Sequence, residues 1–404
     1  MVNFFKRLNI FLVLSYFVLL SSLIFNIFSH NIISHDKFIQ ENELLNYNRK
    51  PHIRVDDINN LQECVPVAIL GGGPGALSSA IYCGRSKIPA YVFMGPNPGG
   101  QLIQTSFVEN IPGVKRQYGA EIIETMMEQA TSFGATLLEE TITQVDFSDP
   151  TKPYKLKTSE GKTISALVVI IATGSSSRKL DIPGEDKYWG KGVAICALCD
   201  CTLFKDLNVA IVGGGDAAIE EAILLSSYAK QITIFVRKEK MRAAPSMQDK
   251  LSQYSNVKVV YNKQPIEIEG DGQYVTGLKY MDLENDNKIE SIPVSGVFLA
   301  IGSNPNSQMF NPYLALNKNG YIITDRHQET SVPRVFAAGD VSDAIFRQAV
   351  IATATGTIAG LNATALLKNG GFTSNVMEKL SPQFYRSLKK VNLNNNAKDS
   401  RSDG

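Results

Sequence analysis

The segment VPVAILGGGPGALSSAIY, residues 65–82, decides the fold of this chain. A short apolar run leads into a glycine-rich turn, and a segment of helix-forming residues follows. The turn carries the G-x-G-x-x-G/A pattern at Gly71, Gly73 and Ala76. The first residue permits a tight turn, the second lets a pyrophosphate approach the backbone, and the small third packs helix against strand. We therefore predict a strand, a turn and a helix whose N-terminus faces the phosphates of a dinucleotide.

The strand that follows departs from this pattern. An acidic residue that binds the ribose usually ends it, but the strand in AYVFMGP, residues 90–96, has Met94 at that position. The contact to the ribose is therefore unexplained by the sequence. A glycine turn that binds no dinucleotide is the alternative interpretation.

A second copy of the pattern lies in NVAIVGGGDAAIEEAILL, residues 208–225, at Gly213, Gly215 and Ala218. The strand after it, QITIFV, is followed by a basic cluster instead of an acid: Arg237, Lys238 and Arg242. Cations at this position fit a ribose 2′-phosphate, so the second site should prefer NADPH to NADH. The alternative is an ordinary solvated run of charges. Two fingerprints in one chain indicate one site for a flavin dinucleotide and one for a nicotinamide dinucleotide.

Three of the five cysteines lie in CALCDC, residues 196–201. A zinc site would need a second pair of ligands, and the remaining cysteines and the four histidines are not spaced as one, so we expect no metal. A disulfide across so short a loop constrains little of the unfolded chain. A redox dithiol, Cys196 with Cys199, is the interpretation that remains, since one thiol of C-x-x-C is commonly acidified into the reactive thiolate.

Two neighbours of the dithiol have two interpretations each. Asp200 could exchange protons with a thiolate or a reduced flavin, or could simply cap the following turn. Cys201 could be a small packed residue, or a third thiol that competes in disulfide exchange.

Composition excludes several classes of protein. Lys and Arg number 40 and Asp and Glu 39, so no bulk charge favours nucleic acid or an anionic membrane. Five cysteines are too few and too clustered for a secreted disulfide scaffold. The length of 404 residues suffices for two domains with extensions.

The N-terminus reads as a targeting segment. Lys6 and Arg7 precede the apolar run LNIFLVLSYFVLLSSLIFNIF, so residues 1–28 are interpreted as a signal peptide or signal anchor. Residues 29–62 resemble a linker or a transit-like segment, and residues 370–404 a flexible tail. A reduced thiol system fits an oxidising lumen poorly. We therefore expect entry into the secretory or membrane pathway and delivery to a plastid-type, apicoplast-like organelle, or else anchoring in a membrane.

Over residues 64–369 the chain resembles the low-molecular-weight thioredoxin reductases, which are NADPH-dependent flavoenzymes. The stretches that carry the resemblance are ILGGGPGALSSAIYCGRS, GGQLIQTSFVENIPG, IIATGSS, CALCD, VAIVGGGDAAIEEA, RKEKMRA and VFAAGDVSDAIFRQA. RAAPSMQDKL is similar to the plastid and cyanobacterial branch, whose fused thioredoxin domain does not follow here. The chain departs from the family at Cys201, where glycine is usual, and at Val236, where histidine is common.

The resemblance implies the residues of each site. Those that would bind FAD are Gly71, Gly73, Pro74, Gly75, Ala76, Gly99, Gly100, Gln101, Leu102, Asn110, Ala172, Thr173, Gly174, Gly339, Asp340, Arg347, Gln348 and Ala349. Those that would bind NADPH are Gly213, Gly215, Asp216, Ala217, Ala218, Arg237, Lys238 and Arg242. The residues that would carry the reaction are Cys196, Cys199 and Asp200.

The resemblance also implies an α/β architecture of two Rossmann-like domains of the three-layer β/β/α type. A discontinuous FAD domain, residues 64–184 and 303–369, would contain an inserted NADPH domain, residues 185–302, with the dithiol. Nicotinamide and dithiol cannot both reach the flavin at once, so two alternating domain orientations are implied, with hinges near residues 184–192 and 302–305. A homodimer is implied by the resemblance alone.

The function that follows is that of a thioredoxin-disulfide reductase, a class II pyridine nucleotide-disulfide oxidoreductase. Electrons would pass from NADPH to FAD, to Cys196 and Cys199, and then to the disulfide of a separate thioredoxin-like protein. One alternative is a related flavin disulfide reductase with another carrier or with ferredoxin as electron donor. The other is a non-catalytic, membrane-tethered flavoprotein.

Overall fold

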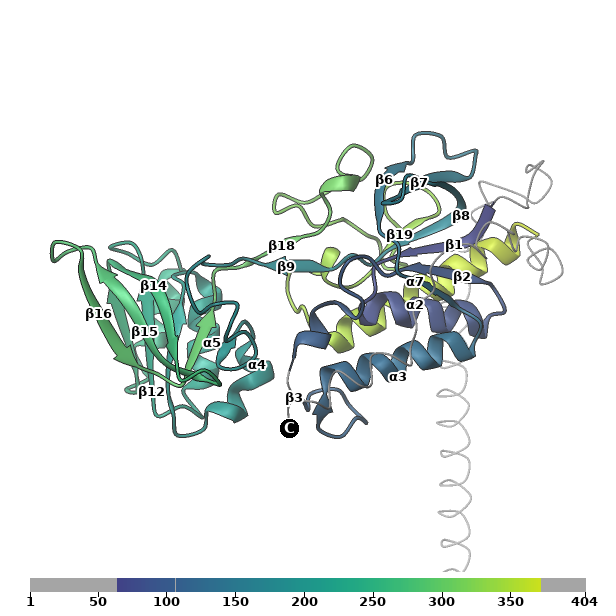
Figure 1. The fold of residues 1–404 in the computed structure, drawn as a ribbon. Coiled ribbons are helices and arrows are strands. Elements are labelled where there is room, and N and C mark those ends of the chain that lie inside the picture. The colour runs from purple at the N-terminus through teal and green to yellow at the C-terminus, as the bar shows by residue number, and fades with distance from the viewer. Residues whose placement is uncertain (1–63, 106, 372–404) are drawn as a thin grey trace, which may run out of the picture. The chain divides into compact units, whose positions relative to one another are not determined.

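A seven-stranded sheet carries the first glycine turn (Figure 1). The computed structural model describes residues 64–105 and 107–371, so the expectations for residues 1–62 and for most of the tail lie outside it. The strand order is β5 (Thr136–Leu138), β2 (Ala90–Phe93), β1 (Cys64–Leu70), β8 (Thr163–Ile171), β7 (Tyr154–Thr158) and β6 (Ile142–Asp146), and β19 (Val335–Ala337) also pairs with β8. All residues of β1 are buried, as expected for a parallel strand covered on both faces.

Three helices accompany this sheet: α2 (Pro74–Arg85), α3 (Gly119–Ser132) and α7 (Ala349–Asn369). Helices α2 and α7 lie side by side, and the Ser79 hydroxyl donates to the carbonyl oxygen of Gly356 over 2.9 Å (Figure 1). By length and composition α7 could cross a membrane, with a hydropathy of 1.5. A core helix meets the same criteria, and Ala359 and Gly360 of α7 are buried.

Several short elements belong to the same region as the seven-stranded sheet. They are η3 (Gly100–Gln104), β3 (Phe107–Val108), β4 (Gln117–Tyr118), η5 (Gln308–Phe310) and η6 (Gly339–Val341).

A second sheet of five parallel strands carries the other glycine turn. Its order is β10 (Val193–Ala194), β17 (Gly296–Leu299), β11 (Asn208–Val212), β12 (Gln231–Val236) and β13 (Val257–Tyr261). Its helices are α4 (Ala197–Asp200), η4 (Cys201–Phe204), α5 (Asp216–Leu225) and α6 (Pro245–Leu251). Because the central strands are rich in Val and Ile and mostly buried, they form the core beneath α5.

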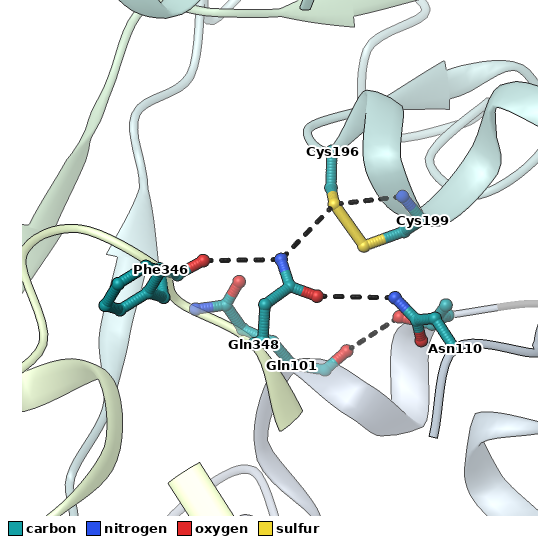
Figure 2. Close-up of a disulfide and its surroundings, with 7 residues drawn as sticks. Gln101, Asn110, Cys196, Cys199, Phe346 and Gln348 are labelled. Carbon is teal, nitrogen blue, oxygen red and sulfur yellow. Dashed lines mark hydrogen bonds between the residues drawn. A yellow bond between two sulfur atoms is a disulfide. The ribbon is translucent and has the colours of Figure 1, made fainter. Parts of the chain in front are cut away.

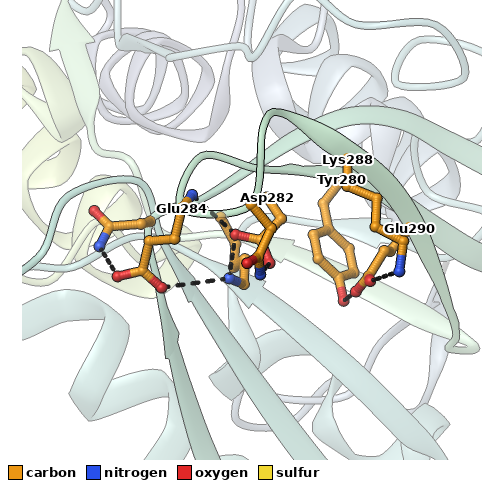
Figure 3. Close-up of polar contacts among 8 residues, drawn as sticks. Tyr280, Asp282, Glu284, Lys288 and Glu290 are labelled. Carbon is orange, nitrogen blue, oxygen red and sulfur yellow. Dashed lines mark hydrogen bonds and ion pairs between the residues drawn. The ribbon is translucent and has the colours of Figure 1, made fainter.

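An antiparallel sheet of β14 (Lys263–Gly270), β15 (Val275–Asp282) and β16 (Lys288–Pro293) belongs to the same region. Polar contacts secure its β15–β16 end (Figure 3). The Lys263 ammonium lies 2.6 Å from the Asp282 carboxylate, and this ion pair lowers the pKa of Asp282 to about 2. Asp282 also accepts a hydrogen bond from the backbone of Glu284, and the Tyr280 hydroxyl donates to Glu290.

The chain crosses between the two regions through β9 (Ser175–Ser177) and β18 (Ser303–Pro305), which pair with each other. The expected hinge near residues 184–192 begins in a packed segment. A Cβ on Gly184 would lie 2.0 Å from the Ile268 carbonyl oxygen, and Tyr188 is buried in a core with Ile268. Gly184 and Tyr188 are therefore packed within the second region, and the hinge itself stays a prediction.

The observed architecture confirms the predicted fold class. Each glycine turn follows a strand that pairs in parallel with both of its neighbours, and each turn opens a helix, as in two dinucleotide-binding domains.

Candidate active site

The first glycine turn is built for close approach. Gly71 has φ +123°, and a Cβ there would lie 2.1 Å from the carbonyl oxygen of Ala172. Gly73 is the N-cap of α2 and offers no side-chain cap, with Pro74 at the first helical position. The Gly99 amide donates to the Gly72 carbonyl oxygen over 3.2 Å, so Gly99 and its neighbour Gly100 lie against the turn. These features leave the start of α2 open to an anion, so the residues present fit a dinucleotide phosphate.

Met94 lies beneath this turn. Its side chain is buried, and its methyl carbon would lie 3.1 Å from a Cβ on Gly72. It fills the end of β2 with an apolar group, so the missing ribose acid is not supplied at that strand end.

Polar residues from distant parts of the chain meet beside the turn. The Gln101 amide donates to the Ser175 carbonyl oxygen over 2.6 Å, and the Ser175 hydroxyl lies 3.4 Å from the Asp340 carboxylate. Thr173 and Asn306 exchange hydrogen bonds between side chain and backbone. Burial raises the pKa of Asp340 to about 6. A carboxyl of this kind suits a ligand hydroxyl, which it can bind as acceptor or donor.

The remaining residues predicted for FAD lie around the same strand ends. Asn110 follows β3, Gly174 follows β8, and Gly339 begins η6, where its amide donates to the Thr355 hydroxyl. Arg347 precedes α7 and donates to the Ser303 hydroxyl over 2.8 Å. Leu102 packs against the hydrophobic core.

The dithiol is oxidised and lies next to this cluster. Cys196 and Cys199 form a disulfide with their Cα atoms 5.3 Å apart. The Gln348 amide nitrogen lies 4.0 Å from the sulfur of Cys196, and its amide oxygen accepts from Asn110 over 3.3 Å (Figure 2). Of the residues predicted to bind FAD, Gln348 therefore contacts the disulfide, and Asn110 contacts Gln348.

Asp200 and Cys201, the two neighbours of the dithiol, differ in their surroundings. Burial raises the pKa of Asp200 to about 6, so this carboxyl can hold a proton close to neutral pH. Asp200 occupies the N-cap of η4 without a side-chain hydrogen bond, which rules out the capping interpretation. Cys201 is buried in the apolar core of the second sheet, and burial raises the pKa of its thiol.

After β12 the chain folds back, so that the loop carrying Arg242 contacts the second glycine turn. A Cβ on Gly213 would lie 2.5 Å from the Ala300 carbonyl oxygen. The Arg242 amide donates to the Gly214 carbonyl oxygen over 2.6 Å, and the Ala244 amide donates to Asp216 over 2.8 Å. Asp216 therefore holds the loop. Arg237, Lys238 and Arg242 are exposed and form no ion pair with another described residue.

Sequence reasoning missed one buried acid of the site region. One carboxylate oxygen of Glu221, on α5, is buried without a hydrogen-bond partner. Burial raises its pKa to about 8, with Arg347 acting in the opposite direction. The sequence shows two adjacent glutamates, Glu220 and Glu221, and only their positions on the helix decide that the first is exposed and the second half-buried.

Comparison with known proteins places the chain in a family. The family model for pyridine nucleotide-disulphide oxidoreductases matches residues 65–356, and the chain belongs to this family. Within it, the curated thioredoxin reductase of Rickettsia typhi is 40% identical over 305 residues, which cover 74% of this chain and 97% of that protein.

Solved structures give the same result. Thioredoxin reductase from Streptococcus pyogenes aligns with a TM-score of 0.72 at 32% identity, covering 76% of this chain and 99% of that one. Lactococcus lactis thioredoxin reductase, in a structure described as the FR conformation, aligns with a TM-score of 0.52 at 30% identity, covering 75% and 99%. The resemblance to low-molecular-weight thioredoxin reductases is confirmed.

Proposed function

We propose that this protein is an NADPH-dependent flavoenzyme that reduces the disulfide of a thioredoxin-like protein. The observation that carries the proposal is the Cys196–Cys199 disulfide in contact with Gln348, which Asn110 in turn contacts. The relatives that cover the same residues are thioredoxin reductases. A ferredoxin-fed reductase would not need the exposed basic cluster, and a non-catalytic flavoprotein would not need the dithiol.

FAD bound at the first turn would supply a group able to take up two electrons and to give them up again, between NADPH and the disulfide. The residues of the chain bind and orient the cofactors. The start of α2 would hold the pyrophosphate, and Asp340 the ribityl hydroxyls. The second turn would hold NADPH, with Arg237, Lys238 and Arg242 at its 2′-phosphate. Asp216 takes part by fixing the loop that carries Arg242.

Asp200 would hold the proton of the thiol chemistry. Reduction of the disulfide produces sulfur anions that must take up protons, and oxidation releases them again. A carboxyl with a pKa near 6 beside Cys199 can lend and recover a proton at neutral pH. The dithiol then attacks the disulfide of the partner protein.

The reaction requires two orientations of the dithiol-bearing domain. The solved structures support this: at nearly equal identity and coverage, the TM-score falls from 0.72 to 0.52 between two thioredoxin reductases. Similar domains in a different mutual arrangement would give such a difference. We place the boundaries between domains at β9 and β18, close to residues 184 and 302.

The test is an anaerobic NADPH titration of the flavin-loaded protein, followed by addition of thioredoxins. We expect the flavin absorbance to bleach and to return as thioredoxin thiols appear. Cys199→Ser should keep bleaching by NADPH and lose disulfide reduction entirely, because the relay lacks one sulfur. A colourless protein would contradict the proposal, and so would unchanged disulfide turnover in Cys199→Ser.

We further propose that residues 1–28 direct the protein into the secretory or membrane pathway, as a cleaved signal or an anchor, toward a plastid-type organelle. The apolar run after Lys6 and Arg7 supports this. A fluorescent fusion with and without these residues tests it, and identical distributions would refute it.

We also propose a homodimer. The resemblance to the family implies it, and Leu361 on α7 leaves an apolar side chain 44% exposed. Sedimentation of the flavin-loaded protein decides between one chain and two.

A further inference from the structure

The side-chain amide of Gln348 has a fixed direction. Its nitrogen lies 3.3 Å from the carbonyl oxygen of Phe346, which can only accept, and its oxygen accepts from the Asn110 amide (Figure 2). The amino group must therefore face Phe346 and the sulfur of Cys196, which is 4.0 Å away. An amide anchored at both ends donates toward the sulfur without losing further side-chain entropy.

The two sulfurs of the disulfide have different surroundings. The sulfur of Cys196 accepts from the backbone amide of Cys199 over 3.2 Å and faces Gln348 as well. Within the described part of the chain, no hydrogen bond reaches the sulfur of Cys199. Because N–H donors stabilise a thiolate much more than a thiol, this asymmetry favours negative charge on Cys196.

We propose that Gln348 is a hydrogen-bond donor to the Cys196 thiolate, and that Asn110 is the positioning residue that aims it. The proposal deepens the proposed function, which names the flavin as electron source. Two electrons from reduced flavin break the S–S bond, and one proton taken up leaves a thiol on Cys199 and a thiolate on Cys196. The long contact to the neutral sulfur would shorten once the sulfur is charged.

The contact between Gln348 and Cys196 links the reactivity of the Cys196 thiol to the orientation of the domains. Gln348 belongs to the segment before α7, whereas Cys196 precedes α4. When the dithiol turns outward, Cys196 leaves the Gln348 donor behind. Its thiol then becomes more basic and, as thiolate, a stronger nucleophile toward the partner's disulfide.

The test measures each thiol separately. Flavin-loaded, full-length protein is reduced with dithiothreitol, which is then removed under argon, and iodoacetamide is added at a series of pH values. Mass spectrometry of the peptides gives the pH midpoint of alkylation for each cysteine. We expect a lower midpoint for Cys196 than for Cys199 in the native protein.

Gln348→Met removes the donor without adding charge and should raise the Cys196 midpoint by about half a unit to one unit. Gln348→Glu keeps the shape but repels the thiolate, so its midpoint should be higher still. Asn110→Ala should raise the Cys196 midpoint by a smaller amount. This variant keeps the test decisive if a Gln348 variant fails to fold. The Cys199 midpoint should stay constant throughout.

Gln129→Met, on the exposed face of α3, is the matched control and should change neither midpoint. Equal Cys196 midpoints in the native protein and in both Gln348→Met and Asn110→Ala, with flavin retained, would overturn the proposal. Dithiothreitol supplies the electrons, so the result stands even if NADPH produces no thiols. That second outcome would refute the proposed function instead.

Discussion

Three partly buried carboxyls in this protein share a raised pKa. Asp200, Glu221 and Asp340 all have a raised pKa, and burial is the largest cause in each case. Water no longer stabilises the charged form, and no cation lies close enough to compensate fully. Two of these residues serve the proposed chemistry, whereas Glu221 is left with an unpartnered oxygen.

Glu221→Gln should remove a pH dependence of stability. Because the folded-state pKa is raised to about 8, protonation stabilises the native protein fully below the unfolded pKa, and this stabilisation is lost as the pH rises toward 8. Relative to the native protein, the variant should therefore gain about 3 kcal/mol between pH 5 and pH 8. Urea unfolding at both pH values measures this. The exposed neighbour gives the control, Glu220→Gln, and equal behaviour of both variants would refute the explanation.

At the scale of elements, α2 and α7 approach each other through small residues. A Cβ on Gly356 would lie 2.1 Å from the carbonyl oxygen of Gly75, and one on Gly360 would lie 2.7 Å from that of Ser79. The turn that starts α2 is thereby fixed to the helix that follows Gln348. The packing of two helices thus sets the geometry of the dinucleotide site.

Gly356→Ala should destabilise the flavin-loaded protein by about 2 kcal/mol, since backbone atoms must shift, and weaken flavin retention. Thermal unfolding and flavin release on dilution measure both effects. The control is the reverse exchange, Ala354→Gly, on the exposed side of α7. It should cost about 1 kcal/mol of helix stability without flavin loss. Flavin loss in both variants alike would show that the helix contact is not the cause.

The basic cluster after β12 makes a second prediction at this scale. Arg237→Ala combined with Arg242→Ala should raise the KM for NADPH by about ten-fold or more, because charge-assisted contacts to the 2′-phosphate are lost. The KM for NADH should change little. Lys230→Ala with Lys250→Ala removes two exposed cations elsewhere and serves as control. Equal effects on the KM values for NADPH and NADH would favour the alternative interpretation, that these residues are an ordinary solvated run of charges.

At the scale of the whole molecule, one hydrogen bond joins the dithiol segment to the residue before Asn110. The Thr202 hydroxyl donates to the Glu109 carboxylate over 2.8 Å, and Glu109 lies 3.8 Å from the Arg116 guanidinium. This contact and the one between Gln348 and Cys196 both stabilise the orientation described here. Both must break when the dithiol turns outward.

Glu109→Ala should shift the balance toward the other orientation. Loss of one hydrogen bond, about 1 kcal/mol, corresponds to a shift of up to about five-fold, so NADPH should reduce the flavin correspondingly faster. Stopped-flow absorbance of the flavin measures the rate. Glu128→Ala, on the exposed side of α3, is the control. An unchanged rate in Glu109→Ala would mean that this contact does not limit the rotation.

Local sequence patterns determined much of this protein. Gly71 and Gly213 must be glycine because a carbonyl oxygen occupies the space of a Cβ, so both turns and their strands could be predicted. The pairing of Cys196 with Cys199 follows from their short spacing. These features depend on residues close together in the chain, which is why a sequence alone reveals them.

Only the tertiary structure decided the rest. It packed Gly184 against Ile268, left Asp200 without a capping bond, and buried one carboxylate oxygen of Glu221 while Glu220 stayed exposed. It also brought Gln348 to Cys196, 152 residues away in sequence. Burial and long-range contact depend on how distant segments pack, and no local pattern encodes that.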